Sequence, residues 1–461
     1  MKEIFSETNN RTTWRKLWSA LAEAQMEYGL VKKDELEDLK SKAGKKNIDI
    51  AKAHKIEKEI RHDLMSEIKV FAEQTKVGGK KIHLGATSAD IEDNADILKM
   101  NDALELVLTK LVSCLRELSR LIDEYKAQPC IGWTHLQPAE PTTLGYRLAN
   151  YAQDIVLDIN TLENLSGMIK GKGFKGAVGT YASYQRTLEG KATAKELEDK
   201  ITEIMGLKVF PVTTQTYPRK VDYLVLSLLA SIAQSTSKFG LDLRIMQSPS
   251  FGELSEPIGK NQVGSSAMPF KRNPISSERI CSLARYIGSL VSVAHGNASN
   301  SILERTLDDS ANRRIIIPEA FLAIDECLMN YMKIISGLVV YPKIMENNFY
   351  KYGAFSTTEA LMMKLVERGG DRQEIHEHLR KISFKAWEKV SEGKENPIIK
   401  DLKSDKLVKE NLNAKEIDST LDPKNHMGES VEACERFLED VTKPILKKYQ
   451  KRTEDKKGPV F

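Results

Sequence analysis

The chain has 461 residues, too many for a single hydrophobic core, so two or three domains are expected. Hydrophobic residues make up 41% and charged residues 29%, the balance of a soluble globular protein. A formal net charge of +4 is too small for a nucleic-acid-binding protein, although it suits an anionic small-molecule substrate. No apolar run approaches the roughly 20 residues needed to cross a bilayer, so no membrane partner is expected.

The cysteine pattern and the N-terminal residues bear on the cellular compartment. The first residues show no apolar core followed by a small-residue cleavage site, so no secretory signal is expected. The cysteines are odd in number, widely scattered and without C-x-x-C spacing: Cys114, Cys130, Cys281, Cys327 and Cys434. Both features are typical of a cytoplasmic protein with reduced thiols.

Along the chain, a first helical region ends at the glycine- and lysine-rich loop of residues 76–94. The clearest helix is predicted over residues 101–126, where leucines and an isoleucine recur at alternating spacings of four and three residues. Similar patterns predict further long helices over residues 145–170, 219–247, 276–300 and 318–337.

These long helices decide the expected fold class. Apolar stripes on more than one side of each helix indicate a bundle of near-parallel helices that other copies of the chain complete. Alternating strand patterns are scarce, so the fold is predicted to be all-α. The bundle is expected to end near residues 337–348, with Pro342 as a stop signal. The expected domains are residues 1–87, 88–340 and 341–461.

The segment GSSAMPFKRNP, residues 264–274, interrupts the helical pattern with two prolines and is predicted to be a loop that carries chemistry. A serine nucleophile would need a G-x-S-x-G elbow after a strand, and that pattern is absent. The other possibility is a serine alkoxide that acts as a general base on a C–H bond. Lys271 and backbone amides would then have to stabilise the alkoxide.

Two histidines have neighbours that could serve chemistry. His135 lies in GWTHLQPAEPTT, a proline-interrupted and loop-like segment, and His62 lies between Arg61 and Asp63. The unperturbed pKa of histidine lies nearest neutrality, which suits proton transfer. A structural role remains the alternative for each.

The segment ERTLDDSANRR, residues 304–314, gathers arginines among carboxylates. One interpretation is a solvated helix end. The other is bidentate capture of a carboxylate or phosphate, for which arginine is better shaped than lysine.

Two further patterns are interpreted without a cofactor. Residues 171–176 match G-x-G-x-x-G but follow no strand, so a turn between helices is favoured over a dinucleotide site. One option is that the backbone amides of this turn lie near an anion. His376 and His378 lie two residues apart on an expected helix and point to different sides. No metal site is predicted.

Six segments carry a resemblance to a known family, in this order: RHDLM, HLGATS, THLQPAEPTT, QTYPRKVD, GSSAMPFKRNP and ERTLDDSANRR. The loop resembles the GSS-x-MP-x-K-x-NP signature of the fumarase/aspartase superfamily. Its Lys-Arg-Asn-Pro form, followed by Ser-Glu-Arg, resembles the adenylosuccinate lyase family in its eukaryotic-like branch. The resemblance implies a three-domain homotetramer in which long helices from four chains form a common core of twenty helices. Each active site would be shared between subunits.

The resemblance also implies a carbon–nitrogen lyase of purine biosynthesis that needs no cofactor. Such enzymes release fumarate by β-elimination from adenylosuccinate, giving AMP, and from succinyl-aminoimidazole-carboxamide ribotide on the route to IMP. The alternatives are a sister lyase, such as one acting on argininosuccinate, and a non-catalytic structural homologue. The KRNP and DDSANRR forms disfavour the former, and intact Ser265, His135 and Lys271 disfavour the latter.

Carried over position by position, the resemblance implies that Ser265 is the general base and His135 the general acid, with Glu278 orienting the histidine. Lys271 and Asn273 would hold a succinyl carboxylate and stabilise charge in the aci-carboxylate intermediate. The remaining implied contacts to phosphate, nucleotide and succinyl groups are Arg61, His62, Asp63, Thr87, Ser88, Thr134, Gln215, Arg279, Arg305, Ser310 and Arg314.

One departure concerns the N-terminus. The family usually carries an Arg-Tyr pair upstream of the segment that here reads EIFSETNNRTTWRKLW, and no such pair precedes it in this sequence. The recorded start could be late, another residue could cover the phosphate, or nucleotide affinity could be reduced.

Overall fold

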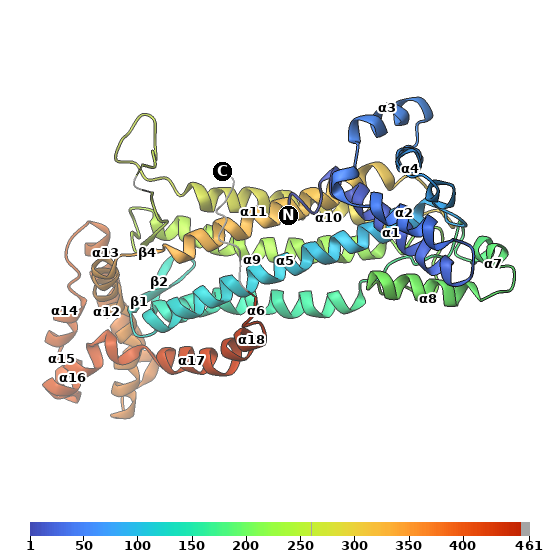
Figure 1. Ribbon diagram of the computed structural model, residues 1–461. Helices are drawn as coiled ribbons and strands as arrows, with labels where there is room; N and C mark the ends of the chain where they lie inside the picture. The colour runs from blue at the N-terminus through green and yellow to red at the C-terminus, as the bar shows by residue number, and fades with distance from the viewer. Residues whose placement is uncertain (260, 453–461) are drawn as a thin grey trace. The chain divides into compact units, whose positions relative to one another are not determined.

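The computed structural model describes residues 1–259 and 261–452, and in this part of the chain the fold is almost entirely helical (Figure 1). Strands form only two small antiparallel pairs: Pro129–Thr134 (β1) with Gln137–Thr143 (β2), and Leu254–Ser255 (β3) with Val339–Val340 (β4). The expected all-α class is therefore confirmed.

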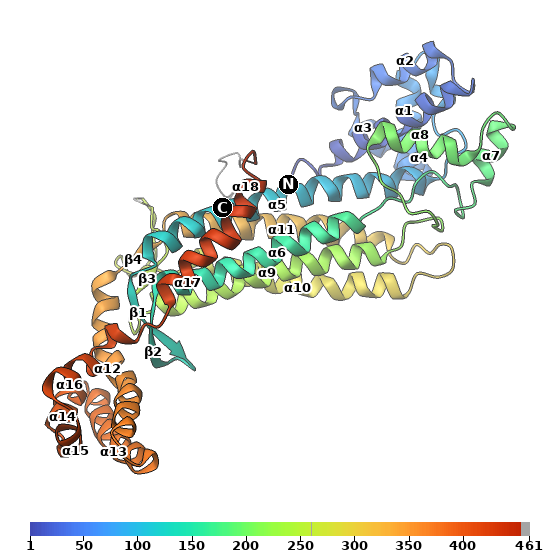
Figure 2. The same cartoon turned by 90° about the horizontal axis from the view of Figure 1, so that it is seen from below.

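Five long helices form the framework. The chain divides into two compact units: unit 1 comprises residues 1–110, 158–234 and 282–327, and unit 2 comprises residues 111–157, 235–281 and 328–461. Each long helix contributes one part to each unit, and within a unit these parts run alongside one another (Figures 1 and 2). The helices are Ser88–Tyr125 (α5), Leu144–Met168 (α6), Lys220–Gln247 (α9), Ile275–Ser299 (α10) and Ser310–Ser336 (α11).

Two of these helices begin earlier than the apolar pattern predicts. The first turns of α5 bury Asp90, Asp93 and Asn94 instead of an apolar stripe, so the search for spaced leucines misses them. In the same way α11 begins at Ser310, upstream of Pro318 within the helix. Buried polar side chains at a helix start require partners, and these partners shape the site described below.

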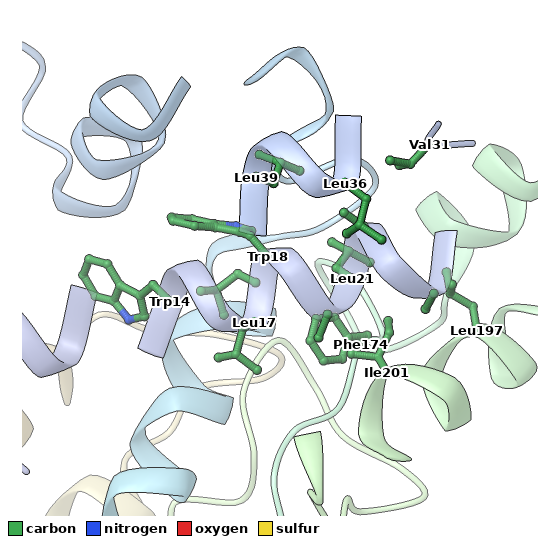
Figure 3. Close-up of a cluster of buried hydrophobic side chains, with 14 of the residues drawn as sticks. Trp14, Leu17, Trp18, Leu21, Val31, Leu36, Leu39, Phe174, Leu197 and Ile201 are labelled. Atoms are coloured by element: carbon green, nitrogen blue, oxygen red, sulfur yellow. The ribbon is translucent and has the colours of Figure 1, made fainter. Parts of the chain in front are cut away.

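The N-terminal part of unit 1 is built from short helices packed around tryptophan and leucine. In Figure 3, Trp18 of the first helix lies beside Leu39 of the second helix, and Leu21 of the first helix lies beside Phe174 and Ile201. Leu17 is completely buried, and full burial of such a side chain stabilises the fold by about 1.5–3 kcal/mol. The short helices are Glu7–Glu27 (α1), Lys33–Lys42 (α2), Ile50–Ile60 (α3), Asp63–Gln74 (α4), Ala182–Leu188 (α7) and Ala194–Met205 (α8).

Unit 2 contains the β1–β2 hairpin, and this corrects one expectation. The segment GWTHLQPAEPTT is not an irregular loop, because Trp133 and Thr134 pair with Pro138 and Gln137 across a tight turn. The prolines did not exclude pairing, since a two-stranded ribbon has two open edges where a missing N–H costs little.

The C-terminal helices of unit 2 pack around a separate apolar cluster that includes Leu361, Leu379 and Leu402. Pro342, expected as a stop signal, is instead the first residue of α12. Proline is tolerated there because the first N–H groups of a helix have no partner within the helix. These helices are Pro342–Glu367 (α12), Arg372–Ser391 (α13), Ile398–Ser404 (α14), Lys406–Asn411 (α15), Ala414–Leu421 (α16), Ser430–Phe437 (α17) and Lys443–Lys448 (α18).

Short 3-10 and π segments complete the secondary structure: Lys45–Asn47 (η1), Gly78–Lys81 (η2), Pro423–His426 (η3) and Leu438–Thr442 (η4). The expected domain limits after residues 87 and 340 stay predictions, although α5 begins at Ser88 and α12 at Pro342.

Among the described residues, α9 alone is long and apolar enough to cross a membrane by length and composition. More than half of its most apolar window is buried inside the protein, as in the core helix of a bundle. It also carries Asp222, which is fully buried in an ion pair with Arg313.

Candidate active site

Unit 1 contains a pocket of about 480 Å³, here called the anion pocket, in which predicted binding residues from distant segments meet. The N-terminal ends of α4, α5 and α11 all reach its lining. Because helix N-termini carry unpaired N–H groups and partial positive charge, this arrangement favours a phosphate or carboxylate. Of the predicted residues, the lining includes Arg61, His62, Asp63, Thr87, Ser88, Gln215, Arg305, Ser310 and Arg314.

A sharp corner between α3 and α4 presents the Arg-His-Asp segment. Arg61 ends α3 in the left-handed region at φ 54°, and His62 is extended and caps α4, its Nδ1 accepting the Met65 N–H at 3.4 Å. Both side chains are exposed at the pocket. Asp63 accepts a hydrogen bond from Arg314 at 2.6 Å. Burial, the largest single influence, would raise the pKa of Asp63, but the charge and hydrogen bond of Arg314, together with the Leu64 N–H, hold that pKa below its ordinary value.

Thr87, just before Ser88 at the start of α5, is held by the carboxylate of Asp90, which is fully buried. The Asp90 oxygens accept the Thr87 N–H at 3.0 Å, the Tyr184 hydroxyl at 3.0 Å and the Gly176 N–H at 3.2 Å. Lys172 forms a buried ion pair with the same carboxylate.

This environment explains the G-x-G-x-x-G match. The turn of residues 171–176 wraps an internal carboxylate, as the expectation of amides near an anion suggested. Gly173 has φ 78°, and a Cβ there would meet the Glu198 Oε1 at 2.1 Å, so a side chain has neither the conformation nor the space.

Glu92 lies in the wall that the anion pocket shares with a second cavity of about 450 Å³, which Trp14 and Asp96 help to line. Its nearest charged partner is Arg314, with an Nη2–Oε1 distance of 3.9 Å. Burial, followed by the neighbouring charge of Asp63, raises the pKa of Glu92 to about 8. A carboxyl group with this pKa is largely protonated at neutral pH and does not repel an incoming anion.

The signature loop in unit 2 places Ser265 within reach of backbone donors. The Ser265 Oγ accepts the N–H groups of Ala267 at 3.3 Å and Met268 at 3.1 Å. Asn273 donates its side-chain N–H to the Gly264 carbonyl at 2.9 Å and so closes the loop. A Cβ at Gly264 would lie 2.1 Å from the Lys271 carbonyl oxygen, so the loop requires glycine there. Two amides on one hydroxyl oxygen are what a stabilised alkoxide needs.

The end of the loop is fixed by Glu256, a residue that the sequence reasoning did not single out. Its buried carboxylate accepts the N–H groups of Ser276 at 3.1 Å and Ser277 at 2.6 Å, in the first turn of α10. This is an N-terminal cap supplied from outside the helix. Lys271 stays exposed, Arg279 is half-buried, and Glu278 is exposed on the same first turns.

His135 and Leu136 form the two-residue turn of the β1–β2 hairpin. Their φ angles of 54° and 60° are those of a type I′ turn, which matches the twist of the strands. Thr134 and His135 are exposed at the tip. In the described part of the chain no hydrogen bond or ion pair joins His135 to Glu278, so the orienting role of Glu278 stays a prediction.

The predicted site residues thus fall into two sets. The anion pocket belongs to unit 1, whereas the signature loop and the hairpin tip belong to unit 2. Sequence reasoning missed Asp90, Glu92 and Glu256. The sequence does offer one signal for these residues: each is a carboxylate at a position that the start of a helix or the end of a loop is expected to bury.

Solved structures define the class of protein. A fumarate lyase from Mesorhizobium sp. BNC1 superposes with a TM-score of 0.83 at 23% identity, covering 95% of this chain and 96% of that chain. A 3-carboxy-cis,cis-muconate lactonizing enzyme from Pseudomonas putida gives a TM-score of 0.84 at 23% identity, covering 98% and 97%. The family model described as "Lyase" matches residues 7–288. The fold is therefore that of the fumarase/aspartase superfamily of lyases.

Relatives with higher identity narrow the class. The adenylosuccinate lyase of Saccharomyces cerevisiae is 41% identical over 460 residues, 99% of this chain and 95% of that protein. That of Schistosoma mansoni is 39% identical over 97% of this chain and 93% of that protein. A family model described as "Adenylosuccinate lyase C-terminus" matches residues 354–437. The chain belongs to the adenylosuccinate lyase family.

Proposed function

We propose that this protein is a carbon–nitrogen lyase that eliminates fumarate from adenylosuccinate, giving AMP, and from succinyl-aminoimidazole-carboxamide ribotide. The observation that carries the proposal is the anion pocket, where four distant family motifs and three helix N-termini meet around one space. Both substrates carry a phosphate, and this combination of arginines and N–H groups is suited to it.

In this proposal Ser265 removes the proton from the succinyl carbon β to the C–N bond. Its two amide contacts and the nearby Lys271 would stabilise the alkoxide that performs this step. The carbanion formed is stabilised as an aci-carboxylate by Lys271 and Asn273. The electron pair then forms the fumarate double bond while the C–N bond breaks.

His135 gives a proton to the departing nitrogen in the same proposal, so that the leaving group is neutral. Its exposed place at a hairpin tip allows approach to a substrate, and Glu278 would hold the ring in position once the site is assembled. Thr134 and Arg279 would contact the succinyl group, and the residues of the anion pocket would bind the nucleotide.

We further propose a cytoplasmic homotetramer whose active sites are shared between subunits. Exposed apolar side chains on the long helices support an oligomer: Leu157, Leu241, Tyr286 and Ile315. At the signature loop, Phe270 is 81% exposed, which suits a loop that another surface covers. All five cysteines are buried and outside any disulfide, which suits a reducing compartment.

The test is an absorbance assay of the purified protein with adenylosuccinate, run beside argininosuccinate and beside fumarate with ammonia. Loss of adenylosuccinate with equal formation of AMP and fumarate is the expected result. Turnover of argininosuccinate instead would identify the sister lyase. Light scattering during gel filtration should give the mass of four 51.9 kDa chains.

A further inference from the structure

The segment QTYPRKVD has more structure than the proposed function uses. Only Gln215 reaches the anion pocket as a predicted contact, yet Tyr217, Arg219 and Asp222 are all buried. Charged side chains are rarely buried without partners, because each must recover the hydration that it loses. The partners of Arg219 lead directly back to the pocket.

Arg219 joins two carboxylates from distant segments of the chain. Its Nη1 and Nη2 donate to both oxygens of Asp93 on α5, each at 3.1 Å, and its Nε donates to the Asp309 Oδ2 at 2.6 Å. Asp309 immediately precedes α11. Its second oxygen, Oδ1, accepts a hydrogen bond from the Arg305 Nη1 at 2.8 Å.

The four residues form a chain that begins at Asp93 in the pocket wall, passes through Arg219 and Asp309, and returns to the pocket at Arg305. The side chains of Asp93, Arg219 and Asp309 are at most 5% exposed, whereas that of Arg305 is 24% exposed and lines the pocket. Burial, the largest single influence, would raise the pKa of Asp309, but the charges of Arg219, Arg305 and Arg313 and the Arg305 hydrogen bond together hold that pKa below its ordinary value. Asp309 is therefore an anion that can hold Arg305.

A neighbouring group of ion pairs is centred on the Tyr217 hydroxyl. Arg313 donates to Asp222 at 2.6 Å and to the Tyr217 hydroxyl at 2.6 Å, and that hydroxyl donates to Asp222 at 2.5 Å. The Tyr217 ring and its backbone N–H contact Arg219 and Asp93, and Arg313 lies 4.0 Å from Asp309. Tyr217→Phe removes the hydroxyl and keeps the ring and the N–H, so it is the control for an effect on the fold.

We propose that Asp309 and Arg219 are positioning residues that fix the Arg305 guanidinium for contact with the anionic substrate. An arginine held in place by a buried carboxylate loses less side-chain freedom when it meets a ligand, so binding is stronger. Because Asp309 is itself held by Arg219, loss of either residue should loosen Arg305. The inference rests on the proposed function and gives a role to two residues, Arg219 and Asp309, to which the position-by-position resemblance assigns none.

Asp309→Asn in the full-length protein tests this. Arg219 keeps both contacts to Asp93, so we expect the variant to fold. The KM for adenylosuccinate should rise about tenfold, while kcat stays within about threefold, because the chemical groups are untouched. Arg219→Lys keeps the charge but loses the forked geometry and should give a smaller rise in KM. Tyr217→Phe, the control, should lower the melting temperature and leave KM within about twofold.

A double-mutant cycle separates positioning from general damage. In an Arg305→Lys background, Asp309→Asn should raise KM by less than twofold, because there is no guanidinium left to hold. Equal KM increases in both backgrounds would overturn the proposal. So would a crystal structure of Asp309→Asn in which Arg305 keeps its orientation. Failure of the wild-type protein to turn over adenylosuccinate would reject the proposed function, a result that is distinct from either of these.

Discussion

The anion pocket and the signature loop are built in opposite ways. Around the pocket, Asp63, Asp90 and Asp309 each accept hydrogen bonds from several donors, and most of their partners are buried. In the loop, the hydrogen bonds of the Ser265 Oγ to the rest of the described chain are those from two neighbouring amides, and Lys271 is exposed. A binding surface can be rigid before the substrate arrives. A base and its stabilising cation need room to close over it.

This comparison predicts that loop substitutions change turnover and leave stability intact, with Ser265→Ala as the largest effect. Without the base, kcat should fall by about 10³ or more. The melting temperature should change by less than about 1 °C, since the hydroxyl contacts only its own loop.

The neighbouring Ser266→Ala is the matched control, because that hydroxyl is exposed and makes no hydrogen bond in the described part of the chain. It should keep nearly full activity. Near wild-type turnover of Ser265→Ala, or equal losses in both variants, would remove Ser265 from the role of base.

A smaller loss of turnover is expected from Gly264→Ala. The added Cβ would collide with the Lys271 carbonyl oxygen, so the loop must shift and move both Ser265 and Lys271. A displacement of about 1 Å costs roughly 10² in rate. Circular dichroism should show unchanged helix content and melting, since the loop supports no core. A variant with full turnover would mean that the loop geometry is not set by this contact.

In unit 1, a single substitution at a residue that supports the anion pocket should lower the stability of the fold. Asp90→Asn removes the charge partner of buried Lys172, and an uncompensated buried charge costs about 3–5 kcal/mol. Urea unfolding should show the loss, and KM should rise because Thr87 loses its anchor. Glu377→Gln breaks an ion pair on the exposed surface of α13 and is the control, with an unfolding curve expected to stay close to that of the wild type. Similar unfolding curves for both variants would contradict the contrast between the two regions.

The long helices could be predicted from the sequence and the hairpin could not, for a physical reason. Long helices such as α9 follow from leucine spacing, because burial of one face repeats with the helical period. The hairpin of residues 129–143 was missed, since its pairing depends on a tight turn at His135 and Leu136 that neither residue type favours. Motif resemblance identified the residues gathered in the anion pocket. It gave no role to Asp90, Glu256 or Asp309, which act through other residues, although Asp309 stands within ERTLDDSANRR.

The smallest expected effect comes from a substitution of Glu92, and the pH dependence of that effect on stability has a defined sign. Because burial and then Asp63 raise its pKa from 4.5 to about 8, the folded state binds more protons than the unfolded state within that window. Stability contributed by this group is complete below pH 4.5 and is lost as the pH rises through 8. Glu92→Gln cannot ionise, so its melting temperature should approach the wild-type value at pH 5 and exceed it at pH 9.

Thermal melts of both proteins across this range measure the difference. Glu377→Gln serves again as control, because the hydrogen bond from Arg380 lowers the pKa of Glu377 to about 2, below the window. Its difference from the wild type should be the same at pH 5 and pH 9. The KM for adenylosuccinate should also rise more steeply with pH in the wild type than in Glu92→Gln, because ionised Glu92 repels the substrate phosphate. A constant difference in melting temperature between Glu92→Gln and the wild type would show that Glu92 is already ionised at pH 5, and the anion pocket would then bind its ligand against that charge.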